Sequence, residues 1–537
     1  MPSAGGSGGD ALPTARPVPR QAGATRSDAP TALIVRVRDA PPEPTAPWRP
    51  TEADQPAPPE PLDAPWLRHL ARLLPMAVVG VLGAIGLNRP GLWEDELATW
   101  GMVTVGFDDF VAVLRNVDAS IGPYYLLMRG WVALAGSSDV ALRMPSLLAM
   151  AAAAGLVAAI GLRVGGLRVG LVAGVLFAVL PTTSRYAQEA RPYAFAVCAA
   201  ALATLLLIRL LERPRFVRYL GYAAVVALLG LMHLVGLLLL AAHALIAWRA
   251  AERRRTFFGW LGAAVAGVLP VLPVLWLGRQ QTGTQINWIP PVTLDRLVDT
   301  PEALFGGPLL AGAVLALAFL GMSMRERAAV ATAWLVLPTL GLLVAAQLTP
   351  LWLPRYLLFT VPAWALVASL ALRRSSLLRG TAAMLAIGLL GIPTQVEIRS
   401  VTGHSQGTKD IAAVLRAHAV PGDILVYGPF DAGDQRTSRD AVNRYVDESW
   451  RPRDVLMTVP ARRQGTLGAR ECADRDVPVC LGRPTRVWIV RKGAFDDPLQ
   501  RIGPAKEAAL KPYAVERTWR VRGFSIALLV RRPAAAK

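Results

Sequence analysis

The chain is poor in cysteine, histidine and charge for its length. Its 537 residues include three cysteines and five histidines, and charged residues make up 18% of the total, below the share usual for a soluble protein. Cys472 and Cys480 lie close together in the sequence, but no histidine stands near them, so they make a poor zinc site. These shortages argue against a metal-built fold and predict no metal site.

Apolar residues are abundant instead. Hydrophobic residues make up 53% of the chain, the mean hydropathy is +0.39, and apolar runs near the length of a bilayer crossing recur. The net charge of +19 would fit a nucleic-acid partner, but the arginines stand in short clusters between apolar runs and no aromatic and basic binding stretch accompanies them. The composition therefore predicts a polytopic membrane protein with no nucleic-acid partner.

Composition divides the chain into three predicted domains. Residues 1–65 are rich in Pro, Ala and Gly and are expected to form a disordered cytoplasmic tail, and residues 66–395 hold the apolar runs. Residues 396–537 turn polar, and "ILVYG", "TRVWIVRK" and "FSIALLVRR" predict strands of a C-terminal extracytoplasmic α/β domain. Cys472 and Cys480 would form a disulfide there or remain two free thiols.

The membrane domain is expected to contain about 11 transmembrane helices. Two of the runs, 219–235 and 236–248, are also consistent with one bent helix. The predicted spans are 73–90, 140–161, 167–183, 192–210, 219–235, 236–248, 257–277, 308–324, 328–348, 356–372 and 378–394.

Basic residues between the spans predict the orientation. The clusters lie on one side of the membrane if the N-terminus is cytoplasmic, which is the side that positive loops prefer. The loop 91–139 and the C-terminal region then face outside, and 121–136 must lie along the outer interface, anchored by aromatic residues, instead of crossing. The clusters contain Arg68, Arg72, Arg163, Arg168, Arg209, Arg213, Arg215, Arg218, Arg249, Arg253, Arg254, Arg255, Arg325, Arg327, Arg373, Arg374 and Arg379.

Polar residues collected at this outer face are the candidate site. Ionisable groups near a membrane must be solvated, paired or directed at a ligand. Paired carboxylates suit general base catalysis, and clustered arginines suit phosphate binding, which together favour the transfer of a sugar from a lipid phosphate. The candidates are Asp95, Glu96, Asp118, Tyr124, Arg185, Tyr186, Gln188, Glu189, Arg191, Tyr193 and Arg355.

Several of these positions also allow a structural interpretation. Asp118 would be a second acid of the site or a helix N-cap, and "SRYAQEARPY" would be a simple polar turn. Arg355 would bind phosphate or anchor the interface. His233 and His243 are more typical of packed hydrogen-bonding groups than of catalysts. The loop "QINWIPP" would cover the site or serve as an interfacial anchor.

Five motifs in order give the chain a resemblance to a known family. "LWEDELATW", "DASIGPYYLL", "LRMPSLLA", "SRYAQEARPYAFA" and "LPRYLLFTVPA" resemble the bacterial glycosyltransferase family 39 group, over about residues 70–395. These are membrane enzymes of the GT-C fold, related to protein O-mannosyltransferases and the lipid A aminoarabinose transferase. The resemblance implies inverting transfer from a polyprenyl-phosphate sugar, with mannose as the favoured sugar, Asp95 as general base and Glu96 as its neighbour.

One position departs from the family pattern. Relatives often carry a histidine before the glycine of "IGPYYLL", where this chain has Ile121, which puts the acceptor in doubt. Adjacent acids should raise one another's pKa, and Glu94 is expected to be a solvated neighbour.

The predicted function is that of a polyprenyl-phosphate-sugar-dependent glycosyltransferase in the plasma membrane. Arg355 with Arg191 or Arg185 would hold the donor phosphate, no cofactor would be needed, and the acceptor would be a protein, a glycolipid or a wall glycan. The alternative is a transporter or flippase for a lipid-linked or anionic substrate, which should carry polar groups near the bilayer midplane and a repeated architecture.

Overall fold

The computed structural model describes residues 65–250, 254–286, 288–428 and 432–533. The segment 1–65, predicted to be disordered, lies outside the described residues apart from Pro65, which begins the first helix. Residues 59–537 belong to one compact unit that holds both the helical region and the C-terminal region. The boundary at 395/396 therefore stays a prediction.

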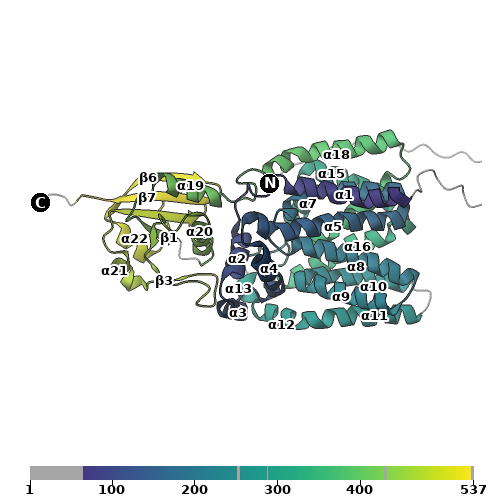
Figure 1. Cartoon of the computed structure of the whole chain (residues 1–537), viewed down its shortest axis with the longest axis horizontal. Helices are drawn as coiled ribbons and strands as arrows, with labels where there is room; N and C mark the ends of the chain where they lie inside the picture. The colour runs from purple at the N-terminus through teal and green to yellow at the C-terminus, as the bar shows by residue number, and fades with distance from the viewer. Residues whose placement is uncertain (1–64, 251–253, 287, 429–431, 534–537) are drawn as a thin grey trace, which may run out of the picture. The chain divides into compact units, whose positions relative to one another are not determined.

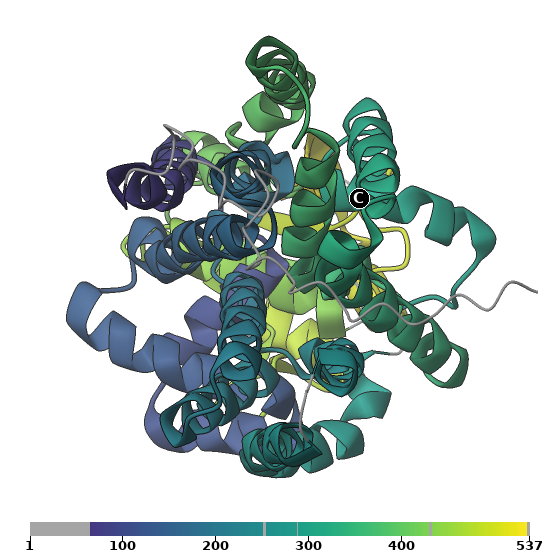
Figure 2. The same cartoon turned by 90° about the vertical axis from the view of Figure 1, so that its right-hand side faces the viewer.

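Long helices running in similar directions make up the larger part of the described chain (Figure 1). Figure 2 looks along this bundle, so that many of its helices are seen end-on. The elements are α1 (Pro65–Ala84), α5 (Asp139–Gly165), α6 (Leu167–Val179), α7 (Pro181–Ala187), α8 (Tyr193–Glu212), α9 (Phe216–Met232), η2 (Leu234–Leu238), α10 (Leu239–Ala250), α11 (Arg254–Val268), η3 (Leu269–Val271), α12 (Leu272–Gln280), α13 (Thr282–Gln285), α14 (Leu294–Phe305), α15 (Pro308–Met322), α16 (Arg325–Leu348), η4 (Pro354–Thr360), α17 (Val361–Ala371) and α18 (Leu377–Ile398).

The helices confirm a polytopic membrane protein, but fewer than eleven qualify as spans. Among the described residues, seven helical segments are long and apolar enough to cross a membrane, or nine when two bent pairs are each counted as one span. The bends are 64° between α6 and α7 and 91° between α14 and α15. The remaining two predicted spans correspond to shorter apolar helices, Phe216–Met232 and Leu234–Ala250, which are separated by a break at His233.

Small residues bring the helices into close contact. A Cβ atom added to Gly161 in α5 would lie 2.8 Å from the Cα of Gly170 in α6, and one added to Gly155 would lie 2.7 Å from the sulfur of Met76 in α1. Helices in a bilayer gain little from hydrophobic burial against each other and associate through such close packing. Glycine at these positions therefore sets the spacing of α5 against α6 and α1.

The segment between α1 and α5 forms short helices that do not span. These are α2 (Glu94–Thr104), α3 (Phe107–Asn116), η1 (Ala119–Ile121) and α4 (Gly122–Ala135), and Figure 1 shows α2, α3 and α4 near the end of the bundle where the C-terminal sheet lies. Two aromatic residues of α4 are not the interface anchors that the sequence predicted. Tyr124 and Tyr125 are fully buried, and the indole of Trp131 donates to the carbonyl of Ala141 at 2.7 Å.

Several basic loops meet one another in space. Arg168 at the start of α6 donates to the carbonyl of Ser375, before α18, at 2.6 Å, and Arg163 near the end of α5 lies 3.7 Å from Glu212 at the end of α8. Clustering of positive loops at one end of the bundle is the pattern on which the predicted orientation depends. The cytoplasmic placement of the N-terminus stays a prediction.

The C-terminal region folds around a five-stranded sheet of order β2-β1-β5-β7-β6. β1 pairs in parallel with β2 and β5, and β7 pairs antiparallel with β5 and β6. The three strands predicted from the sequence correspond to β1, β5 and β7. The elements are α19 (Thr408–His418), β1 (Ile424–Gly428), α20 (Ala432–Tyr445), β2 (Arg453–Asp454), β3 (Met457–Val459), β4 (Arg470–Glu471), η5 (Asp474–Asp476), α21 (Val477–Leu481), β5 (Arg486–Lys492), α22 (Pro504–Leu510), β6 (Tyr513–Val521) and β7 (Phe524–Arg531).

A disulfide closes a short loop beside this sheet. Cys472 and Cys480 are bonded, with Cα atoms 6.7 Å apart, at a separation of eight residues in the sequence. Of the two alternatives that the sequence left open, a disulfide or two free thiols, the structure contains the disulfide. Cys198 in α8 is a free cysteine.

Candidate active site

Three acids open helix α2. Glu94, Asp95 and Glu96 are its first three residues, where the exposed backbone N–H groups and the helix dipole favour negative charge. Successive residues of a helix point about 100° apart. Adjacent acids therefore have different surroundings, and each of the three has its own set of partners.

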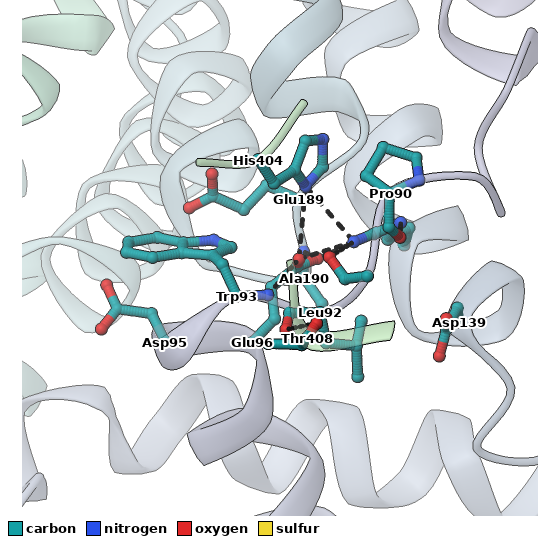
Figure 3. Close-up of polar contacts among 12 residues, drawn as sticks. Pro90, Leu92, Trp93, Asp95, Glu96, Asp139, Glu189, Ala190, His404 and Thr408 are labelled. Carbon is teal, nitrogen blue, oxygen red and sulfur yellow. Dashed lines mark hydrogen bonds and ion pairs between the residues drawn. The ribbon is translucent and has the colours of Figure 1, made fainter. Parts of the chain in front are cut away.

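Glu96 lies inside the protein and is paired with Arg143 of α5. Both side chains have 0% exposure, and the Arg143 guanidinium donates to the two carboxylate oxygens at 2.8 and 2.7 Å. The amide of Ala190 donates to the same carboxylate at 2.9 Å, and His404 Nδ1 lies 3.4 Å away. Figure 3 shows this cluster with His404 above the carboxylate. A bidentate, fully partnered arrangement is what a buried charge requires.

These partners decide the protonation of Glu96. Burial raises the pKa of this carboxyl, but the charge and hydrogen bonds of Arg143, with a smaller contribution from His404, outweigh burial and hold the pKa far below its usual range. The expectation that neighbouring acids raise one another's pKa is therefore wrong for Glu96. An ionised, unexposed carboxylate cannot reach a substrate, so Glu96 holds α2 against α5 and is not a partner in proton transfer.

Asp95 points away from this cluster, as Figure 3 shows. Its side chain is 22% exposed, and one carboxylate oxygen lies 3.9 Å from Nε of Arg191 and 3.8 Å from a terminal nitrogen of Arg355. These distances bring the charges together without a hydrogen bond. Asp95 is thus the partly exposed acid that faces the predicted phosphate-binding arginines, whereas Glu94, 17% exposed, is paired with other cations.

The two arginines come from separate elements. Arg191 lies in the connection between α7 and α8, and Arg355 lies in η4. Nε of each is buried and has no hydrogen-bond partner among the described residues. The guanidinium of Arg355 also lies 5.7 Å from the ring centroid of Trp93 and 5.4 Å from that of Trp288, which fixes its orientation. Unpartnered guanidinium nitrogens next to an accessible carboxylate suit the binding of an anion.

Arg185 has a different partner. It forms an i,i+4 ion pair with Glu189 and lies 5.8 Å from the ring of Trp93. Glu189 is almost fully buried, and burial raises its pKa although Arg185 opposes this. The structure therefore places Arg185 at the site but already neutralised, and Arg191 and Arg355 are the arginines left for a ligand.

Aromatic side chains line the same region. The rings of Tyr186 and Tyr193 meet edge to face at 5.5 Å, and the ring of His233 lies 5.7 Å from Tyr193 and 5.4 Å from Tyr356. Both ring nitrogens of His233 are buried with no hydrogen-bond partner among the described residues. His243 instead lies between Thr204 at 3.1 Å and Tyr222 at 2.8 Å, as expected for a packed hydrogen-bonding group.

Asp118 connects to the arginines indirectly. It accepts from the hydroxyl of Tyr125 at 2.9 Å, and that hydroxyl lies 3.4 Å from a nitrogen of Arg191. The residue precedes η1 with a left-handed backbone, φ 60°, and its side chain makes no capping hydrogen bond. Asp118 therefore occupies the N-cap position of η1 without a side-chain capping hydrogen bond, and it contacts Tyr125, which lies next to Arg191.

Two predicted site residues are fully buried. Gln188 has no exposed surface and donates to the carbonyls of Gly83 and Ile85 at 2.9 and 2.8 Å, so it fastens the α7–α8 connection to the end of α1. Tyr124 has no exposed surface either and packs against Phe195, with ring centroids 5.9 Å apart. Neither side chain can contact a substrate in this arrangement.

The prediction for Glu94 was also wrong. This residue is not a solvated neighbour, because its carboxylate lies 2.8 Å from Arg436 and 2.6 Å from Lys492, both in the C-terminal region. Sequence reasoning missed these two partners and also missed Arg143 and His404. A usable signal existed for Arg143, since an arginine inside a predicted span marks a paired or functional group.

No group of three or more His, Cys, Asp or Glu side chains that could hold a metal ion occurs in the described ranges.

Comparisons with known proteins agree with this architecture. A family model described as "Dolichyl-phosphate-mannose-protein mannosyltransferase" matches residues 122–277, under a third of the chain. That range includes Arg143, Arg185 and Arg191 and excludes Asp95 and Arg355. No curated protein sequence matches the chain.

Solved structures of similar fold cover most of the chain. ArnT from Cupriavidus metallidurans in the apo state is 14% identical with a TM-score of 0.56, over 85% of this chain and 97% of that one. The same protein bound to undecaprenyl phosphate has a TM-score of 0.53 over the same shares, also at 14% identity. An Archaeoglobus fulgidus oligosaccharyltransferase tethered to an acceptor peptide has a TM-score of 0.42 at 11% identity, over 80% of this chain and 70% of that one, and carries no argument. The chain has the GT-C fold, and the family match indicates a glycosyltransferase.

Proposed function

We propose that the protein transfers a sugar from a polyprenyl-phosphate donor to an acceptor hydroxyl at the outer face of the plasma membrane. The observation that carries this proposal is the position of Asp95, whose accessible carboxylate lies 3.9 Å from Arg191 and 3.8 Å from Arg355. A base and an anion-binding pair are thus available within one small region.

The charges of the site fit such a donor. Asp95 carries one negative charge against the two positive charges of Arg191 and Arg355, whereas Arg185 and Glu96 are already neutralised by their own partners. Among Asp95, Arg191 and Arg355 one positive charge is in excess, and a polyprenyl-phosphate sugar is a phosphodiester with one negative charge. Arginine is suited to this role because its planar guanidinium donates in a fork to phosphate oxygens.

The comparisons support the donor class. The family model that matches residues 122–277 is described as "Dolichyl-phosphate-mannose-protein mannosyltransferase", and one of the similar ArnT structures is bound to undecaprenyl phosphate. Mannose is the sugar that the family description favours. The acceptor would be a protein, a glycolipid or a wall glycan, and Ile121, where relatives often have histidine, separates this chain from them on the acceptor side.

The proposed reaction is a single displacement. The acceptor oxygen attacks the anomeric carbon, the new carbon–oxygen bond forms as the bond to the phosphate oxygen breaks, and the electron pair leaves on the lipid phosphate. Asp95 takes the acceptor proton. Because the lipid phosphate leaves as an anion, its departure needs no general acid, and Arg191 and Arg355 stabilise the developing charge.

Other residues have supporting roles in this proposal. Trp93 and Trp288 both lie close to the Arg355 guanidinium, and Tyr186 and Tyr193 provide aromatic surface next to the arginines. The reaction as written requires no cofactor besides the lipid-linked donor.

The direct test uses purified protein in liposomes with radiolabelled mannosyl undecaprenyl phosphate, a panel of other undecaprenyl-phosphate sugars, and a cell-envelope fraction as acceptor. The expected result is release of undecaprenyl phosphate together with label in the acceptor fraction. Arg355→Gln should lose this activity, and Arg520→Gln, which changes an arginine that is 63% exposed in the C-terminal region, should retain it. Failure of the wild-type protein to transfer from any donor would refute the proposal.

A further inference from the structure

The C-terminal region contacts helix α2 along its whole length. At the start of the helix, the Tyr445 hydroxyl accepts from the amide of Leu92 at 2.7 Å, and the Thr408 hydroxyl donates to the carbonyl of the same residue at 2.9 Å. Gln406 accepts from the amide of Glu94 at 2.8 Å. The contact with Glu94 satisfies one of the amides that a helix start leaves without an intrahelical partner, and the two contacts with Leu92 hold the chain just before the helix.

The side chain of Glu94 reinforces the same contact. One carboxylate oxygen accepts from Arg436 of α20 at 2.8 Å and the other accepts from Lys492, the last residue of β5, at 2.6 Å. The Glu94 side chain is 17% exposed, so solvent screens these pairs less than it would a surface pair. Two charged donors from different elements converge on one carboxylate of α2.

Two glycines let the C-terminal region come close. A Cβ atom at Gly91 would lie 2.2 Å from the Thr408 hydroxyl oxygen, and one at Gly101 would lie 2.3 Å from a guanidinium nitrogen of Arg462. Arg462 is held there by Asp440, with both contacts at 2.6 Å. Glycine inside a helix is unfavourable by itself, so Gly101 has a packing reason to be there.

Helix α2 depends on such contacts for its position. It has 11 residues, and isolated helices of this length are marginally stable in water. On one side Glu96 binds Arg143 of the membrane helix α5, and on the other Glu94 binds the C-terminal region. Asp95 lies between these two attachments.

We propose that the C-terminal region is a clamp that positions the base Asp95 by holding helix α2, with Glu94, Arg436 and Lys492 as positioning residues. This inference rests on the proposed function for the role of Asp95, whereas the hold on α2 can be measured without any activity. The clamp gives the C-terminal domain a part in the reaction although Asp95, Arg191 and Arg355 all lie outside it.

The test compares full-length wild-type protein with Glu94→Gln, Lys492→Gln and the double variant. Hydrogen exchange of the amides in residues 94–104 should become faster by on the order of tenfold in each single variant, because charge-assisted hydrogen bonds are lost. The double variant should show little change beyond Glu94→Gln, since that substitution already removes the ion pair with Lys492. Asp496→Asn is the matched control, because Asp496 pairs with Arg520 at the exposed surface.

Kinetics with mannosyl undecaprenyl phosphate separate positioning from general damage. Displacement of Asp95 should lower kcat by on the order of tenfold and leave KM for the donor unchanged, since Arg191 and Arg355 lie on other elements. Glu94→Asp, which keeps the charge, should recover part of the loss.

Each outcome decides one of the two proposals. Unchanged exchange of α2 in Glu94→Gln, or additive effects of the two substitutions, would overturn the clamp. Faster exchange with wild-type kcat would show that the clamp holds α2 but does not position the base, which overturns the inference. An inactive wild-type protein would refute the proposed function, and the exchange data would still show whether the clamp exists.

Discussion

Replacing Glu96 with glutamine should destabilise the protein strongly, although glutamine has nearly the same size as glutamate. Glu96 neutralises Arg143 where both side chains have 0% exposure. The variant would leave a buried guanidinium facing an amide, and breaking one partner of a buried pair costs about 3–5 kcal/mol. No discount for solvent applies, because neither group is exposed.

The surroundings of Arg143 sharpen this prediction. Arg143 also donates to the carbonyls of Leu87, Pro90 and Gly91 at 2.8, 2.9 and 3.1 Å. A second substitution, Arg143→Gln, would leave these three acceptors without their donor, at about 1–3 kcal/mol for each unsatisfied group. The double variant should therefore remain as unstable as Glu96→Gln instead of recovering.

The measurement is the free energy of unfolding in mixed detergent micelles, followed by tryptophan fluorescence. The matched control is Glu212→Gln, which breaks the exposed pair with Arg163, 3.7 Å apart, and should cost about 0–1 kcal/mol. A cost for Glu96→Gln no larger than that of the control would refute the reasoning, and so would full recovery in the double variant.

Three further predictions follow from the described contacts. Burial and the charges of nearby arginines lower the pKa of His404 to about 3 from 6.5. Between these pH values the unfolded chain binds a proton that the folded protein does not, so the free energy of unfolding should fall by up to about 1.4 kcal/mol for each pH unit from 6.5 toward 3. Unfolding measured across this pH range should show a weaker dependence on pH for His404→Gln. Replacing both Cys472 and Cys480 with serine should lower unfolding stability by about 2.5 kcal/mol, the loop-closure value for so short a loop, with an unchanged midpoint contradicting it. Arg355→Gln should weaken undecaprenyl phosphate binding by roughly 10-fold or more, measured by the fluorescence of the tryptophans beside Arg355, whereas Arg520→Gln should not.

The fold was largely predictable because its signals are local in the sequence. Apolar runs mark bilayer crossings, and alternating or continuous apolar stretches marked the strands β1, β5 and β7. The number of spans was less predictable, because 216–232 and 234–250 are too short to be assigned by length and the chain breaks at His233. Tyr124 and Tyr125 of α4 were misassigned because burial by other elements does not show in their own sequence.

The candidate site was predictable only in part. Asp95, Arg191 and Arg355 come together as the motifs suggested, but Glu96 and His404 are 308 residues apart and Glu94 and Lys492 are 398 apart. Pairs at such separation leave no local pattern. Adjacent acids were grouped because they are neighbours in sequence, whereas helix geometry turns them toward different partners. The resemblance already singled out Asp95 among the three acids, but the partners of Glu94 and Glu96 required the structure.

The most direct test of the account is the transfer rate of Asp95→Asn with mannosyl undecaprenyl phosphate, measured alongside its binding of undecaprenyl phosphate. Asparagine keeps the shape of the side chain but cannot accept the acceptor proton. The account predicts a fall in kcat of about 10²–10⁴-fold with undecaprenyl phosphate still bound, because Arg191 and Arg355 are intact. Asp108→Asn, at an exposed acid of α3, should transfer at the wild-type rate. An Asp95→Asn variant as active as wild type would contradict the central claim that Asp95 is the base.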